Sequence, residues 1–370
     1  MEERNLPAKG SEVSRRSLLR MGGGVGALAM SGVQFGAFLE GSNPAFAADK
    51  PLKVAVIAQQ MAAQSDTRAW DGLQQWLKGM KLDNVWQVNL VDAKGDPGAL
   101  VSQVQDAISA KVDAILVMFG TLTAAHAALV SLTESKIPFI SLDSGWQAPA
   151  IADITSNNYV IGSQMSQQMV DELLSRGKQK AKICAIIADF HHGTRKRGKV
   201  MRQVLSENQW ITLVDERVIQ YAGFYETTQN ATNDWLTRFG DDLDAIWTPW
   251  DEPAMAASEV IVAHNRQKQI FCVGEDGHPT AIEKMRQPDW PDICTCAQAF
   301  ELWGAYTGWL INEIVGKGRN PKEVVPTPIV QFPAPLLVKG VNLPPPGAPP
   351  YEATDLYYIY RERAIAGMKG

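Results

Sequence analysis

Cysteine, long apolar runs and an excess of positive charge are all scarce in this sequence. Its 370 residues include four cysteines, too few for a disulfide framework. Lys and Arg total 35 against 40 Asp and Glu, so the formal net charge is −5. This acidic balance argues against nucleic acid and anionic membranes as main partners. With 45% hydrophobic and 20% charged residues, the composition is that of a globular protein, and the length allows two domains.

The one extended apolar stretch lies near the N-terminus and follows two arginines. Arg15 and Arg16 precede residues 21–39, which are rich in Gly and Ala, and small residues flank Phe46 further on. This pattern resembles a twin-arginine signal peptide, so residues 1–47 are expected to be removed and the protein to work in the periplasm. An uncleaved membrane anchor is the alternative, but the glycines of the run weaken it, because a spanning helix needs about 20 strongly apolar residues.

From Lys53 onward, short apolar runs alternate with stretches of helical spacing. The rhythm restarts after Asn157-Asn158, which indicates two successive sets of βα units. Such units imply an α/β fold with parallel sheets covered by helices on both faces. Ligands of these folds bind outside the carboxyl ends of the strands. The predicted strands are 54–58, 86–92, 113–118, 137–143, 183–187, 213–221, 245–248 and 270–274.

Polar and aromatic side chains follow several of these strands directly, where a ligand would bind. A strand-end Asp could instead cap the next helix, an Arg could be a solvated helix residue, and a Trp could belong to the core. The candidate ligand residues are Asp66, Asp143, Arg197, Phe224, Trp250, Asp276 and Gln298.

Five short segments carry a resemblance to a known family. They are Ile140-Ser141-Leu142-Asp143, Ile154-Thr155-Ser156-Asn157-Asn158, Gly193-Thr194-Arg195-Lys196-Arg197-Gly198, Trp250-Asp251-Glu252-Pro253-Ala254-Met255-Ala256 and Val273-Gly274-Glu275-Asp276-Gly277. In this order and at these intervals, the chain from Lys53 to Val338 resembles the type I periplasmic sugar-binding proteins of ABC transporters, in the ribose/galactose-binding group. That resemblance implies a two-lobed protein that captures a monosaccharide or sugar alcohol and delivers it to a membrane permease, as a monomer without cofactor or enzymatic activity.

The resemblance also implies lobe boundaries. The first lobe would comprise residues 49–156 and 299–325, and the second 157–298 and 326–340, followed by a Pro-rich tail at 341–370. The three crossings between lobes would then fall near Ser156-Asn157, Gln298-Ala299 and Pro326.

By position, four candidates match family residues that hydrogen-bond sugar hydroxyls, namely Asp143, Arg197, Asp276 and Gln298. Phe224 and Trp250 fall at cleft-facing places, and Asp66 lies in the first ligand loop.

Three departures from the family pattern predict a more acidic pocket than a ribose site. Ser144 stands where an Arg is usual, and Trp250 stands where an Asn is common. The paired aromatics of the first ligand loop are absent, and Ser65 and Asp66 lie near that place. A sugar alcohol, another monosaccharide or a modified sugar therefore remain open as ligands.

Other functional classes have less support in the sequence. A metal site at Asp189, His191 and His192 is disfavoured, because adjacent histidines rarely face one ion and no third ligand has suitable spacing. An enzyme lacks a Gly-x-Ser-x-Gly elbow or phosphate loop, and the adjacent Asp251 and Glu252 cannot flank a glycosidic bond. A DNA-binding repressor lacks a helix-turn-helix before Lys53. A periplasmic sugar sensor that feeds a membrane receptor stays open as the alternative.

Overall fold

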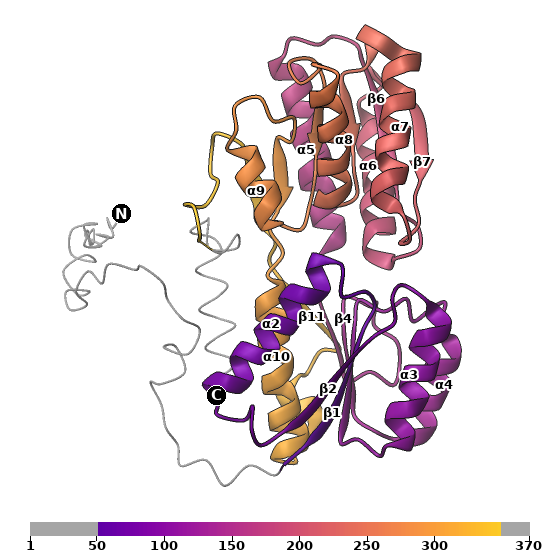
Figure 1. The fold of residues 1–370 in the computed structure, drawn as a ribbon, viewed down its shortest axis with the longest axis vertical. Helices are drawn as coiled ribbons and strands as arrows, with labels where there is room; N and C mark the ends of the chain where they lie inside the picture. The colour runs from indigo at the N-terminus through magenta and orange to yellow at the C-terminus, as the bar shows by residue number, and fades with distance from the viewer. Residues whose placement is uncertain (1–50, 349–370) are drawn as a thin grey trace, which may run out of the picture.

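Two lobes, each built on a parallel sheet, make up residues 51–348, which are the residues that the computed structural model describes (Figure 1). The first lobe holds six strands in the order β11-β5-β4-β3-β1-β2. Four strands of the second lobe run in the order β7-β6-β8-β9, and β10 and β12 form a separate antiparallel pair. The predicted α/β fold with parallel sheets is confirmed.

The strands of the first lobe are β1 (Lys53–Ala58), β2 (Gln87–Asp92), β3 (Ala114–Met118), β4 (Phe139–Leu142), β5 (Ala152–Ser156) and β11 (Ile329–Phe332). Those of the second lobe are β6 (Ala181–Ile187), β7 (Ile211–Val218), β8 (Ala245–Trp247), β9 (Phe271–Val273), β10 (Cys294–Cys296) and β12 (Leu336–Val338).

Helices cover both faces of the first sheet. On one face lie α2 (Gln64–Gly79) and α10 (Phe300–Ile311), and on the other lie α3 (Pro97–Ser109) and α4 (His126–Ser135) (Figure 1). Helices α2 and α10 touch through glycines, because a Cβ added at Gly304 would lie 1.8 Å from the carbonyl oxygen of Ala69. A short α11 (Pro321–Val324) follows α10 and a π-helical turn at Asn312–Gly316.

The second sheet is also buried on both sides. Its helices are α5 (Asn158–Ser175), α6 (His192–Glu207), α7 (Phe224–Phe239), α8 (Asp251–Ala263) and α9 (Pro279–Met285), and a 3-10 turn at Gly240–Asp242 follows α7. Side chains alternate along β6, so that Ile183 packs into the core on one side of the sheet and Cys184 into the core on the other. This two-sided burial explains why the strand reads as a continuous apolar run.

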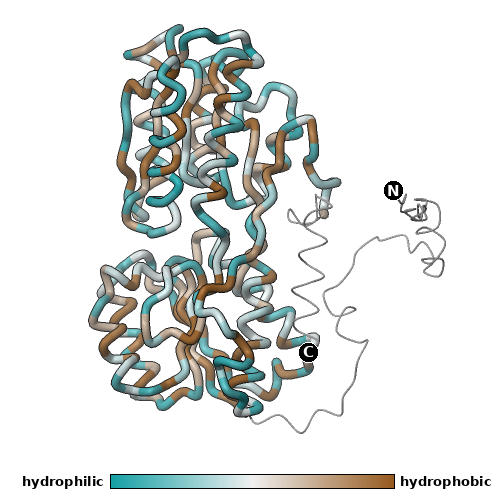
Figure 2. Tube along the Cα trace, turned by 180° about the vertical axis from the view of Figure 1, so that it is seen from behind, coloured by the Kyte–Doolittle hydropathy of each residue, from teal (hydrophilic) through white to brown (hydrophobic). Residues whose placement is uncertain are grey.

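The chain passes between the lobes at three places, which Figure 2 shows from behind. It crosses between β5 and α5, between β10 and α10, and between β11 and β12. The prediction of the third crossing at Pro326 is wrong, because β11 pairs in parallel with β5 and extends the first sheet. Prolines are tolerated beside an edge strand, so Pro326 and Pro328 precede β11 without breaking it, and residues 333–335 form the crossing.

The predicted signal peptide and the end of the tail, from residue 349, lie outside the described residues. Between residues 51 and 348, no helix combines the length and the apolarity that a membrane span requires. The four cysteines, Cys184, Cys272, Cys294 and Cys296, are buried and have free thiols.

Candidate ligand-binding site

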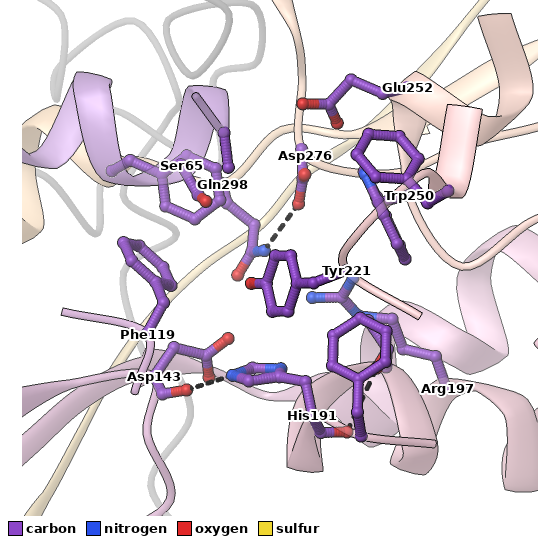
Figure 3. A pocket seen from close by; sticks show the side chains of 15 residues that line it. Ser65, Phe119, Asp143, His191, Arg197, Tyr221, Trp250, Glu252, Asp276 and Gln298 are labelled. Atoms are coloured by element: carbon purple, nitrogen blue, oxygen red, sulfur yellow. Dashed lines mark hydrogen bonds between the residues drawn. The ribbon is translucent and has the colours of Figure 1, made fainter. Parts of the chain in front are cut away.

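A small cavity lies between the lobes, at the carboxyl ends of the strands (Figure 3). Its volume is about 50 Å³. Polar groups converge on this space within aromatic walls, which is the usual composition of a small-molecule site. Its lining residues are Ala63, Ser65, Phe119, Asp143, Phe190, His191, Thr194, Arg197, Tyr221, Phe224, Trp250, Glu252, Asp276, Gln298 and Phe300.

The structure brings most of the predicted ligand residues to this cavity, namely Asp143, Arg197, Phe224, Trp250, Asp276 and Gln298. Asp66 is the exception and does not line it. Its buried carboxylate accepts hydrogen bonds from the backbone N–H of Gln60 at 3.2 Å and the hydroxyl of Ser65 at 3.1 Å, so it holds the start of α2 together. The cavity is lined instead by the preceding residue, Ser65.

Asp143 follows β4 and presents an ionised carboxylate. Its Oδ1 accepts a hydrogen bond from Asn158 Nδ2 at 3.2 Å, a very short one from Thr155 Oγ1, and lies 3.4 Å from His192 Nε2. Burial would raise the pKa of this carboxyl, but the hydrogen bond from His192 and the positive charge of Arg197 help to outweigh it and lower the pKa. Asp143 therefore presents a hydrogen-bond acceptor at the cavity at neutral pH.

Arg197 projects from α6 and is held in place on several sides. Its Nε donates to Asn158 Oδ1 at 2.8 Å, its Nη1 donates to the carbonyl of Pro249 at 2.8 Å, and it forms a close ion pair with the buried Glu275. Burial would lower the pKa of Arg197, but Glu275, Asp276 and Asp143 raise it. The guanidinium is thus a fixed, permanent cation beside the cavity.

Asp276 and Gln298 face each other at the cavity, and Gln298 Nε2 donates to Asp276 Oδ1 at 3.2 Å (Figure 3). Glu252 lies near them, and burial together with the charge of Asp276 raises its pKa to about 8. Glu252 is therefore mostly protonated at neutral pH. Two buried oxygens, Glu252 Oε2 and Gln298 Oε1, have no hydrogen-bond partner within residues 51–348. Buried polar atoms need hydrogen-bond partners, and an O–H group can both donate and accept, so the cavity suits a ligand rich in O–H groups.

Aromatic rings form much of the cavity wall. Trp250 lies 5.2 Å from Phe224 and 6.4 Å from Phe190, measured between ring centroids. Phe190 in turn lies 4.5 Å from Tyr221. Such rings offer flat apolar faces to the C–H groups of a ligand whose O–H groups face the carboxylates.

Several lining residues escaped the sequence analysis, above all the aromatics Phe119, Phe190, Tyr221 and Phe300. Phe119 directly follows β3, and Phe190 and Tyr221 lie shortly after β6 and β7, so the rule on strand ends could have found them. Phe300 begins α10, directly after a crossing, and no local pattern marks it.

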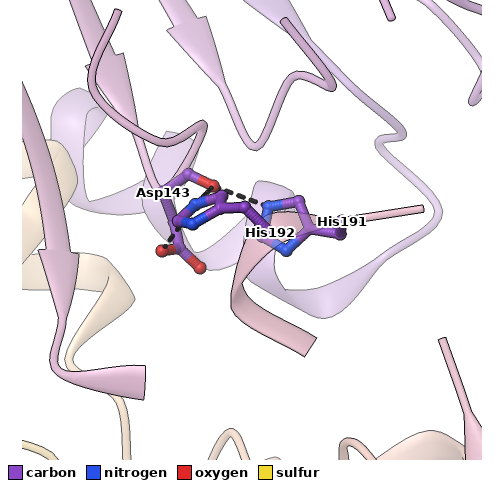
Figure 4. Close-up of side chains that lie close together, drawn as sticks. All are labelled: Asp143, His191 and His192. Carbon is purple, nitrogen blue, oxygen red and sulfur yellow. Dashed lines mark hydrogen bonds and ion pairs between the residues drawn. The ribbon is translucent and has the colours of Figure 1, made fainter. Parts of the chain in front are cut away.

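The sequence shows no third metal ligand at a suitable spacing from the histidine pair, but the fold brings a carboxylate from a distant segment to it. Asp143, from the first lobe, meets His191 and His192, from the second (Figure 4). However, the Nε2 atoms of the two histidines lie 2.6 and 2.8 Å from a single oxygen, the backbone carbonyl of Asp143. These are hydrogen-bond distances, shorter than the separation of roughly 3.3 Å between two ligand atoms on a tetrahedral zinc ion.

Hydrogen bonding explains these contacts. The Nδ1 of His191 accepts from the backbone N–H of Gly193 at 3.2 Å, and the Nδ1 of His192 lies 3.2 Å from Lys196 Nζ. Each Nε2 therefore carries the proton and donates it to the Asp143 carbonyl. Burial also lowers the pKa of His191 to about 3, which keeps that ring neutral.

Comparison with known proteins identifies the class. The profile described as periplasmic binding protein domain matches residues 54–319, and the chain belongs to this family. It is 25% identical over 252 residues to the ribose import binding protein RbsB of Bacillus subtilis, covering 68% of this chain and 77% of that protein. It is 22% identical over 268 residues to a xylitol-binding protein of Mycolicibacterium smegmatis, covering 72% and 73%.

Solved structures show the same fold. An ABC sugar transporter subunit from Rhodobacter sphaeroides matches with a TM-score of 0.68 at 24% identity, covering 78% of this chain and 98% of that one. A solute-binding protein from Bacillus halodurans with bound myo-inositol matches with a TM-score of 0.67 at 20% identity, covering 79% and 96%. The chain thus belongs to the periplasmic binding protein family and shares its fold with these sugar-binding proteins, in agreement with the resemblance of its sequence to the type I periplasmic sugar-binding proteins of the ribose/galactose group.

Proposed function

We propose that this protein captures a monosaccharide or sugar alcohol between its lobes, in the periplasm, and delivers it to the membrane permease of an ABC sugar importer. The observation that carries the proposal is the cavity, where Asp143 of the first lobe and Asp276 of the second lie within aromatic walls. A carboxylate accepts hydrogen bonds from hydroxyl groups, and the low dielectric of an enclosed site strengthens them.

The ligand class follows from the balance of charges at the cavity. Three carboxyl groups line it, those of Asp143, Asp276 and the mostly protonated Glu252, against the single guanidinium of Arg197, which is already paired with Glu275. This arrangement offers little to an anionic ligand. It favours a neutral polyhydroxy compound, which agrees with the ribose and xylitol named for the two relatives.

We assign the protein a binding role without turnover. Of the two adjacent carboxyls, Asp251 is engaged by the protein itself, since its Oδ2 accepts from the backbone N–H of His278 at 2.7 Å and from Thr295 Oγ1 at 2.9 Å. Of this pair only Glu252 lines the cavity, so the two adjacent carboxyls cannot flank a glycosidic bond as the acid and the nucleophile of a glycosidase do.

Export in the folded state is the second part of the proposal. It rests on Arg15 and Arg16 in the N-terminal sequence. The fold supports it as well, because the four buried free cysteines require no oxidising compartment for folding.

Calorimetry of the mature chain against ribose, xylitol, myo-inositol and allose tests the function. We expect reversible binding of at least one compound, with the ligand recovered unchanged by NMR. Asp276→Ala should weaken that binding at least tenfold, because a hydrogen bond to a charged group is lost, while the exposed control Asp189→Ala leaves it unchanged. Failure of wild-type protein to bind any carbohydrate, or conversion of the ligand, would overturn the proposal.

A further inference from the structure

Each aspartate of the cavity is held through its backbone by the opposite lobe. Asp276 belongs to the second lobe, and its carbonyl accepts a hydrogen bond at 3.0 Å from Arg68 Nη1, which comes from α2 of the first lobe. The same guanidinium donates to the carbonyl of Gly277 at 3.4 Å and, through Nη2, to that of Gln298 at 3.0 Å. Arg68 of the first lobe thus hydrogen-bonds to the loop of the second lobe that carries Asp276.

The reverse contact occurs at Asp143. This residue belongs to the first lobe, and its carbonyl accepts hydrogen bonds from His191 and His192 of the second lobe, at 2.6 and 2.8 Å. The two contacts are crossed, since each lobe holds the aspartate that the other lobe presents to the cavity. We call the Arg68 contacts and the histidine contacts the two clasps.

Both aspartates have an unusual backbone. Asp143 has a φ of 39° and Asp276 a φ of 111°, in a region that residues other than glycine rarely adopt. A residue keeps such a conformation only where its surroundings impose it. The clasps act on the carbonyls of these two residues, so they help to set the direction in which each carboxylate enters the cavity.

Residues of the first lobe hold the guanidinium of Arg68 in position. Glu301 of α10 accepts from Arg68 Nε at 2.7 Å and from Nη2 at 3.0 Å, and Arg68 lies over the ring of Phe300 at 4.9 Å. Arg68 is 5% exposed and does not line the cavity. The guanidinium is therefore fixed by residues of its own lobe, and it contacts Asp276 only when the two lobes are together.

We propose that Arg68 and His192 are positioning residues that make lobe closure and ligand binding depend on each other. This inference rests on the proposed function. A ligand that binds the carboxylate of Asp276 fixes the same residue whose carbonyl Arg68 holds, so each contact stabilises the other. The clasps form only in the closed state, so their loss should speed ligand release and leave ligand capture unchanged.

Stopped-flow tryptophan fluorescence with xylitol, or with the tightest ligand of the calorimetric panel, separates release from capture. We expect Arg68→Gln to raise the release rate at least tenfold and to change the association rate less than twofold. Arg68→Lys keeps the positive charge beside Glu301 but lacks the planar guanidinium that donates to several carbonyls at once. It should therefore give an intermediate release rate. Arg68→Gln also loses the ion pair with Glu301 inside the first lobe, so the melting temperature of the ligand-free protein should fall, and the release rate is the deciding measurement.

Arg266 provides the matched control, because its Nη2 donates to the carbonyl of Gly240 at 2.6 Å within one lobe. We expect Arg266→Gln to lower the melting temperature without changing the release rate. If Arg68→Gln, like Arg266→Gln, lowers the melting temperature and leaves the release rate unchanged, Arg68 is a structural residue and the proposal is wrong. An unchanged release rate in Arg68→Lys overturns it as well, should the Gln variant fail to fold.

A ligand-independent measurement keeps this inference separate from the proposed function. Spin labels at Glu134→Cys and Lys199→Cys, exposed positions on the two lobes, report the distance between the lobes in ligand-free protein. We expect Arg68→Gln to deplete the shorter, closed distance relative to wild type. Identical distance distributions would overturn the clasp even if no carbohydrate bound.

Discussion

Replacing Asp143 by Asn isolates the part of this side chain that faces the cavity. Its Oδ1 is occupied by Thr155, Asn158 and His192, whereas no protein donor contacts its Oδ2 among the hydrogen bonds of residues 51–348. An asparagine keeps an oxygen in the Oδ1 position and replaces Oδ2 by an NH₂ group. The substitution thus removes the charge and one acceptor from the cavity while it preserves the internal hydrogen bonds.

The expected magnitude follows from these contacts. A hydrogen bond to a charged group contributes about 1.5–3 kcal/mol, so ligand affinity should fall by about tenfold to a hundredfold. Stability should fall by only about 1 kcal/mol, because Oδ1 keeps its donors but loses charge assistance. That loss corresponds to a decrease in melting temperature of about 2–4 °C.

Calorimetry and thermal unfolding of the same variant measure the two effects. Asp153→Asn is the matched control, because Asp153 is equally buried nearby and does not line the cavity. Its carboxylate accepts from Ser141 Oγ at 2.6 Å and from the backbone N–H of Ser144 at 3.1 Å. The control should lose stability and keep its affinity within twofold. If Asp143→Asn also keeps its affinity within twofold, Asp143 does not bind the ligand and the reasoning is refuted.

Three further predictions concern pH, packing and export. Because Glu252 has a pKa raised to about 8, the folded protein keeps a proton that the unfolded chain loses above pH 4.5. The free energy of unfolding should therefore fall as pH rises from 4.5 to 8, by at most about 1.4 kcal/mol per pH unit. Urea unfolding of Glu252→Gln should show a shallower fall over the same range. Gly304→Ala should destabilise the first lobe by about 1–3 kcal/mol or more, because its Cβ would meet the carbonyl of Ala69, and an unchanged unfolding midpoint would contradict this packing. Replacing Arg15 and Arg16 by Lys should leave precursor in the cytoplasm on fractionation, and unchanged export would exclude the twin-arginine route.

The sequence predicted what depends on local pattern. Buried strands such as β3 and β6 read as apolar runs, because parallel strands covered on both faces carry apolar side chains at every position. The rule that ligands bind at the carboxyl ends of such strands then selected Asp143 and Asp276, which both line the cavity.

The failures of prediction concern contacts between distant segments. The pairing of β11 with β5 joins residues far apart in the chain, and nothing within Ile329–Phe332 indicates on which lobe the strand belongs. The meeting of Asp143 with His191 and His192 depends on how the two lobes come together. The contacts of Arg68 escaped prediction for the same reason, since its carbonyl partners lie about 200 residues further along the chain.

Asp66 was misplaced for a different reason. It occupies the expected loop, but the start of α2 buries its carboxylate against Gln60 and Ser65. A sequence pattern places a residue in a loop and does not determine whether its side chain turns toward the ligand or toward the backbone of its own loop.

Small-angle X-ray scattering of the mature protein, with and without saturating ligand, tests most directly that two lobes enclose the ligand. The structure has its lobes joined by the contacts of Arg68 and of the histidine pair, so it corresponds to the closed state. Closure requires dihedral changes at the three crossings, including residues 333–335 between β11 and β12. We predict a smaller radius of gyration in the ligand-saturated protein than in the ligand-free protein. A radius that stays the same on saturation would contradict closure and would describe a rigid binder instead.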